Sequence, residues 1–82
     1  MPHYHFNIHD GENQCLDLDG TELPDMNAVR AEAARDLYEL AKEMLPIAGR
    51  RDFSLSVTDG AGTVILQEIL SVTVERLKVA SP

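Results

Sequence analysis

Three histidines near the N-terminus are the residues whose types and spacing best fit a chemical role: His3, His5 and His9. On an extended strand, His3 and His5 share a face about 7 Å apart, so both could reach one transition-metal ion. Asp10 follows as a possible oxygen ligand. His9 lies about 13 Å from His5 by the same strand rise, so it can bind the same metal ion only if the strand bends. The three histidines are therefore candidate metal ligands; the alternative is that they occupy the solvent face of an edge strand.

Four carboxylates crowd the next segment: Asp17, Asp19, Glu22 and Asp25. Two converging acids could share a proton or hold a divalent cation. Their spacing does not match an EF-hand loop, which needs more ligands and a closing glutamate. A turn at Asp19 and a helix N-cap at Asp25 account for two of them without a ligand.

Nucleophilic catalysis has little support in this sequence. Cys15 has no base beside it and is expected to be a small core residue. Ser54 and Ser56 lack the glycines of a nucleophile elbow. The segment 59–62 reads as a turn and not as a phosphate loop. We therefore expect no enzymatic activity and no cofactor.

Composition narrows the function classes further. The chain has 82 residues with 14 acids against 7 Lys and Arg, a formal charge of −7, which repels phosphate backbones and anionic membranes. No apolar run approaches the roughly 20 residues of a membrane span, and the N-terminus has no signal-peptide pattern. The lone cysteine fits a reducing compartment. The sequence predicts one cytoplasmic domain, 1–82, that binds neither nucleic acid nor membrane.

The elements that must position these residues follow from hydrophobic periodicity. Residues 3–9 alternate and predict a strand, and the Asp10-Gly11 turn leads to a short return strand, so 1–18 form a hairpin. A helix is expected over 25–45, ended by Pro46. The expected core pairs a helical stripe with alternating strand residues: Val29, Ala33, Leu37, Leu40 and Met44 with Tyr4, Phe6, Ile8, Phe53, Leu55 and Val57.

A second hairpin is expected over 53–70, with its turn at 59–62. Residues 71–82 form a C-terminal extension, in which 72–79 could continue the strand or form a short helix. The predicted fold class is α+β: a ββαββ order, with one long helix on one face of a four-stranded, mostly antiparallel sheet. The first and third strands are plausible neighbours.

One helix covers one face of a sheet, so the second face requires an explanation. Val64, Leu66 and Leu70 are expected to face the helix, while Ile65 and Ile69 point the other way. The second face would then carry a mixed patch typical of association surfaces: His5, Asn7, Ile65, Gln67 and Ile69. We expect a two-fold homodimer through this patch, or an unidentified protein partner. Alternatively, residues 72–79 fold back over the isoleucines.

Several short motifs, in order, resemble a known family. They are Tyr4-x-Phe6, Asp10-Gly11, the helix entrance Asp19-x-x-Glu22-Leu23-Pro24-Asp25, Ala28-x-x-x-Glu32-Ala33 and Asp59-x-x-Gly62-x-Val64. Together they resemble a family of short alphaproteobacterial, notably rhizobial, domains of unknown function. The resemblance implies a fold and a bacterial host, and no reaction. More loosely, the chain is similar to the antitoxin half of Hic-type toxin–antitoxin pairs, although it lacks room for their further strand and DNA-binding segment.

These observations favour a non-enzymatic protein-interaction or regulatory domain. An antitoxin-like regulator is the alternative, and a metal or small-ligand binder that uses the strand histidines is the second alternative.

Overall fold

The computed structural model describes residues 1–11, 13–44 and 49–80. These residues form one helix and five strands in an α+β arrangement, which confirms the predicted fold class. The elements follow in the order β1 (His3–His9), β2 (Gln14–Cys15), β3 (Thr21–Glu22), α1 (Met26–Met44), β4 (Gly49–Thr58) and β5 (Val64–Val74).

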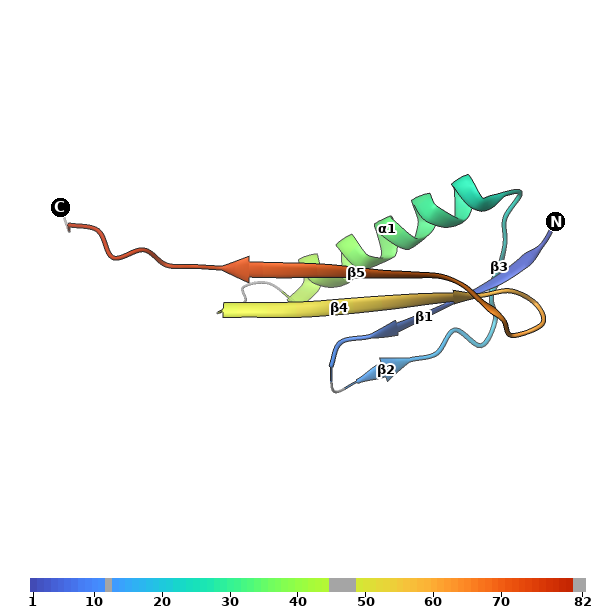
Figure 1. The fold of residues 1–82 in the computed structure, drawn as a ribbon, viewed down its shortest axis with the longest axis horizontal. Coiled ribbons are helices and arrows are strands. Elements are labelled where there is room, and N and C mark those ends of the chain that lie inside the picture. The colour runs from blue at the N-terminus through green and yellow to red at the C-terminus, as the bar shows by residue number, and fades with distance from the viewer. Residues whose placement is uncertain (12, 45–48, 81–82) are drawn as a thin grey trace.

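The strands form one antiparallel sheet in the order β2-β1-β4-β5, with β3 paired to β1 beside β2 (Figure 1). The predicted contact between the first and third strands is confirmed as the pairing of β1 with β4, in which Phe6 lies opposite Val57. The pairing is antiparallel because the segment 14–22 returns the chain to the start of β1 before the helix begins. β5 therefore lies at one end of the sheet.

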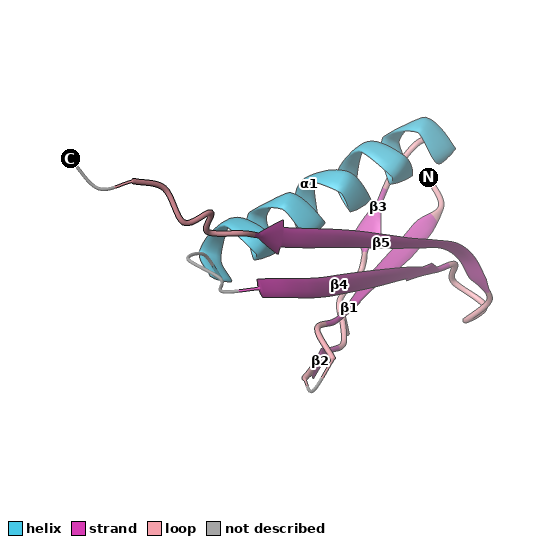
Figure 2. Ribbon diagram, turned by 60° about the vertical axis from the view of Figure 1, so that its left-hand side comes forward, coloured by secondary structure: helices cyan, strands magenta, loops and turns pink. Residues whose placement is uncertain are grey.

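Helix α1 begins where its N-cap was predicted. The Asp25 carboxylate accepts the backbone N–H of Ala28 at 2.9 Å, which satisfies one of the helix's free donors. The helix is described to Met44; the predicted terminal residue Leu45 and Pro46 lie outside the described residues. α1 covers one face of the sheet and contacts β1, β4 and β5 (Figure 2).

The core lies between α1 and this face of the sheet. Its buried residues are Tyr4, Phe6, Val29, Ala33, Leu37, Ala41, Phe53, Leu55 and Val57, and all of them except Ala41 belong to the predicted core. Ile8, Leu40 and Met44, also predicted, are partly buried and pack against this cluster. Ala41 was missed, because alanine carries little weight in a hydrophobic pattern although it lies one turn after Leu37.

The return strand of the first hairpin differs from the prediction. Instead of one strand through Leu18, there are two short pairings, Gln14–Cys15 and Thr21–Glu22, separated by a segment that leaves the sheet. The prediction that Cys15 is a core residue is wrong, because Cys15 is exposed. Helix α1 contacts β1, β4 and β5, so it does not cover β2, the outer strand that contains Cys15.

β5 decides between the alternatives for the C-terminal part of the chain. The strand continues to Val74, and residues 75–80 run on without regular structure, away from the body of the domain (Figure 1). They do not fold back over the sheet as a cover for Ile69, which is 71% exposed.

A β-bulge corrects the predicted faces of β5. Val57 lies opposite Leu66, but Thr58 lies opposite Val64, so Ile65 is the extra residue. As a result, Ile65 packs against the core, and Val64 is exposed. The expectation that Ile65 shares the uncovered face with Ile69 is wrong, because strict alternation does not anticipate an inserted residue.

Across the residues that the structure describes, no helix has both the length and the apolar character to cross a membrane.

Candidate functional site

The most specific polar cluster lies where the outer edge of β1 has no strand partner. Between β2 and β3 the chain leaves this edge, and the Asp17 carboxylate takes the place of a strand. Its Oδ2 accepts the backbone N–H of Phe6 at 3.1 Å, and its Oδ1 accepts the N–H of Gly20 at 2.9 Å. Asp17 thus satisfies an amide of β1 that would otherwise face outward at a sheet edge.

Side chains from the uncovered face of β1 hold the same segment from a second direction. The His3 Nε2 lies 2.7 Å from the carbonyl oxygen of Asp19, and the His5 Nδ1 lies 2.8 Å from that of Asp17. Because a carbonyl oxygen only accepts, both ring nitrogens are the protonated donors in these bonds. The Asn7 Oδ1 accepts the N–H of Asp17 at 2.9 Å. We call residues 16–20, held in this way, the edge segment.

Gly20 is the residue that lets the edge segment lie so close to the two imidazoles. Its φ is +77°, and a Cβ at this position would lie 2.4 Å from the His3 Nε2 and 3.0 Å from the His5 Cε1. Any side chain would therefore combine an unfavourable backbone conformation with a steric clash. Gly20 of the Asp19-Gly20 turn is therefore required for the packing of the edge segment against His3 and His5.

These contacts define what the histidines do in this structure. The rings of His3 and His5 are brought together, with centroids 5.3 Å apart in an edge-on arrangement. His9 lies at the far end of β1, where its Nδ1 accepts the N–H of Gly11 at 3.3 Å. Among the described residues, no three His, Cys, Asp or Glu side chains are placed to hold a metal ion. Metal binding through these histidines stays a prediction.

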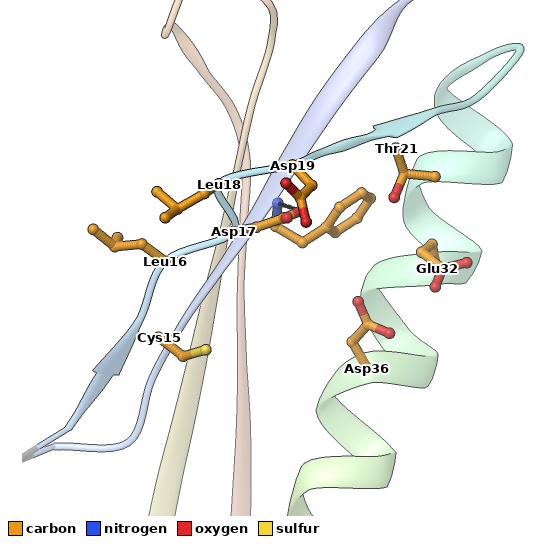
Figure 3. Close-up of a pocket in the computed structure, with 9 residues that line it drawn as sticks. Cys15, Leu16, Asp17, Leu18, Asp19, Thr21, Glu32 and Asp36 are labelled. Carbon is orange, nitrogen blue, oxygen red and sulfur yellow. Dashed lines mark hydrogen bonds between the residues drawn. The ribbon is translucent and has the colours of Figure 1, made fainter.

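A groove of about 460 Å³ lies between the edge segment and α1 (Figure 3). Four carboxylates line it: Asp17 and Asp19 from the edge segment, Glu32 and Asp36 from the helix. The side chains of Leu16 and Leu18 project away from the helix, and they are 57% and 84% exposed. The groove is thus acidic, and two apolar side chains without cover lie beside it.

The helix carboxylates in this groove interact with each other. Burial raises the pKa of Asp36, and the charge of Glu32 and a hydrogen bond with Glu32 raise it further. Glu32 also forms an ion pair with Arg35, whose guanidinium lies 2.6 Å from the Glu32 Oε2. Ionisation of Asp36 is therefore disfavoured in the folded chain.

Asp17 behaves in the opposite way. Burial opposes its ionised form, but the N–H groups of Gly20 and Phe6 bond the carboxylate, and His5 lies nearby, so the pKa of Asp17 lies below its ordinary value. The ionised form is therefore the one that holds the edge segment.

The uncovered face of the sheet is the second candidate surface. Cross-strand rows place Asn7, Ser56 and Gln67 side by side, and His9, Ser54 and Ile69 in the next row. The Gln67 Nε2 donates to the Ser56 Oγ at 3.5 Å, so these two members of the first row are linked. Ile69 is a large apolar side chain, 71% exposed, in the middle of β5.

The predicted interface residues are therefore mostly brought together. Asn7, Gln67 and Ile69 lie on the uncovered face, and His5 lies on the same face with its ring against the edge segment. Ile65 does not belong to this face, because of the bulge. The role of Asp17 was missed; its position in a break between two short pairings is visible only once the strand partners are known.

The two edges of the sheet differ. On the β1 side, the edge consists of two short pairings and the edge segment, so little free strand remains. On the other side, β5 is an 11-residue strand whose single described partner is β4.

Comparisons with known proteins place the chain in a family. Neither the search of curated proteins nor the search of solved structures returned a match. The family model with the description "Domain of unknown function (DUF6894)" matches residues 3–73, which include all five strands and the helix apart from the last residue of β5. Because the match covers most of the chain, this protein belongs to the DUF6894 family.

Proposed function

We propose that this protein is a non-enzymatic interaction domain of the cytoplasm that binds another protein chain through the uncovered side of its sheet. The observation that carries the proposal is Ile69, a large apolar side chain that is 71% exposed at the centre of an edge strand. Isolated exposed apolar residues are common, but Val64, which pairs with Thr58 on the same face of the sheet, is exposed as well. Exposed apolar side chains on an edge strand favour association.

The proposed absence of catalysis is supported by the way the hydroxyl groups are used. The Ser54 Oγ donates to the carbonyl oxygen of His9, and the Ser56 Oγ accepts from Gln67. Both serine hydroxyl groups therefore form hydrogen bonds between neighbouring strands of the sheet. Cys15 is free and exposed, a state that suits a reducing cytoplasm.

Affinity capture from the native host tests the proposal. The chain is immobilised in three forms: wild type, Ile69→Asp and Tyr38→Asp. Tyr38 is the matched control, since it is a large exposed side chain (61%) on the helix, away from the uncovered face. We expect wild type and Tyr38→Asp to retain the same protein, which Ile69→Asp loses, because a charge cannot be buried there without a partner.

Retention of the same protein by all three forms would contradict the proposal, because the uncovered side would then have no part in binding. Circular dichroism of each form shows whether the helix is intact, so that unfolding of a variant is not read as loss of binding.

The antitoxin-like regulator is a second candidate, favoured by a separate observation. Leu16 and Leu18 lie exposed beside an acidic groove, which suits a basic partner with apolar anchors. Co-expression with the product of the neighbouring gene tests it. A compact basic ribonuclease-like neighbour that co-purifies, and that is lost with Leu18→Asp but not with Ile69→Asp, would support this second candidate over the first.

A further inference from the structure

We propose that β5 pairs with β5 of a second copy of this chain, antiparallel and about a two-fold axis at Ile69, so that the two sheets become one continuous sheet. This inference rests on the proposed interaction function and deepens it by naming the partner and the geometry. The groups that bind would be the backbone N–H and C=O groups of β5 that point away from β4.

The first argument is that one edge of the sheet is protected and the other is not. Native proteins guard edge strands with short lengths, prolines, charges, bulges or covering loops. On the β1 side, the pairings are two residues long, and the Asp17 carboxylate occupies the Phe6 amide. β5 has 11 residues and contains no proline and no lysine. Its bulge lies at Ile65, near its start, so the strand from Leu66 to Val74 is regular.

The second argument is that β5 is complementary to itself. With the axis at Ile69, this residue lies opposite the partner's Ile69 on the uncovered face. On the helix face, Leu66 lies opposite the partner's Val72. Leu66 and Val72 are only partly buried within one chain, so a neighbouring strand would complete their cover. Cross-strand pairs of aliphatic side chains stabilise a sheet.

The third argument concerns charge. Two copies that each carry −7 repel one another, so the contact must lie where the charge is low. Residues 49–74, which include β4 and β5, carry only Arg50 and Arg51 against Asp52, Asp59 and Glu68. Most of the excess acid therefore lies elsewhere in the chain. β5 itself contains one charged residue, Glu68.

The same register also determines where residues 75–80 lie in the proposed dimer. Residues 75–80 continue past β5 with Leu77 and Val79 exposed, 79% and 78%. Opposite a partner in this register, they run beside its turn between β4 and β5.

Disulfide trapping tests the pairing and its register. In a Cys15→Ser background, which removes the only native cysteine, Ile69→Cys places two thiols directly opposite each other. Opposed strand residues have Cα atoms about 4.5–5.5 Å apart, within the range of a disulfide. We expect Ile69→Cys to form a covalent dimer under mild oxidation.

A mixed pair checks the register independently. Residue 67 of one copy lies opposite residue 71 of the other, whereas the two copies of residue 67 are about 13 Å apart along the strands. Gln67→Cys and Ser71→Cys should therefore cross-link when mixed, and neither should cross-link alone. Glu68→Gln should increase the fraction of covalent Ile69→Cys dimer, since the two Glu68 carboxylates lie diagonally across the axis.

Absence of the Ile69→Cys dimer, or equal cross-linking of Gln67→Cys with itself, would overturn the β5 pairing. Neither result bears on the capture experiment, in which Ile69→Asp can still lose a different protein. Failure of the edge pairing and failure of the proposed function are thus distinguishable.

Discussion

The Asp17 carboxylate accepts the backbone N–H of Phe6 at 3.1 Å, at a point where the outer edge of β1 lies beside the edge segment and not beside a paired strand. Phe6 is itself a buried core residue, so this one contact links the edge segment to the core. The fold thus closes one edge of its sheet with a side chain and leaves the edge at β5 open.

Asp17→Ala should destabilise the fold by about 1–3 kcal/mol, because the N–H groups of Phe6 and Gly20 both lose their acceptor. Asp19→Ala is the control. It removes a carboxylate of the same groove but keeps the backbone carbonyl to which His3 bonds. Chemical denaturation measures both. Equal losses for the two variants would show that the Asp17 bonds contribute little.

Gly20→Ala should lower the free energy of unfolding by more than Gly62→Ala. Both glycines have positive φ, +77° and +86°, so both variants suffer the backbone penalty of about 1–2 kcal/mol. Only at Gly20 does the added Cβ meet His3, whereas nothing lies within 4 Å of a Cβ at Gly62. His3→Ala should therefore recover part of the loss in Gly20→Ala and none in Gly62→Ala. Recovery in neither would contradict the close packing of the histidines.

Asp36→Asn should stabilise the protein at neutral pH. Because the pKa of Asp36 is raised in the folded state, its contribution to stability is present below the unfolded pKa and is lost as pH rises through the folded pKa. An asparagine does not ionise, so the gain over wild type should grow as pH rises from about 4 towards neutrality. Thermal unfolding over this pH range measures the gain. In a Glu32→Gln background the gain should shrink; an unchanged gain would contradict the role of Glu32.

Zinc should not raise the melting temperature of the wild-type chain above that of a His3→Ala, His5→Ala double variant. A metal that binds only the folded state raises stability by mass action, and it needs free ring nitrogens on both residues. Each ring keeps one nitrogen that does not donate to a carbonyl, but no third His, Cys, Asp or Glu side chain among the described residues is placed to complete a site. Differential scanning fluorimetry with tag-free protein makes the comparison. A rise in wild type that the double variant lacks would establish the histidine site.

The sequence predicts the helix and the central strands well, because these elements have strong periodicity. The stripe through Val29, Ala33 and Leu37 and the alternation through Phe53, Leu55 and Val57 each have one physical interpretation, burial of one face. The Asp25 cap was also predictable, since its carboxylate acts within one turn of its own position.

The features that the sequence does not reveal depend on contacts between distant residues. The bulge at Ile65 results from how β5 fits against β4, so alternation assigns Ile65 and Val64 to the wrong faces. The role of Asp17 depends on Phe6, which lies 11 residues away across a turn. Ile65→Asp is accordingly expected to unfold the chain rather than to dissociate it.

The molecular mass in solution tests the central claim most directly. Light scattering at high micromolar concentration should give about 18 kDa for wild type and Tyr38→Asp, twice the 9.1 kDa of one chain. Ile69→Asp should give the mass of one chain with unchanged helix content, because its charge would lie directly against an identical charge across the axis. A wild-type mass near 9 kDa under these conditions would contradict self-association through β5.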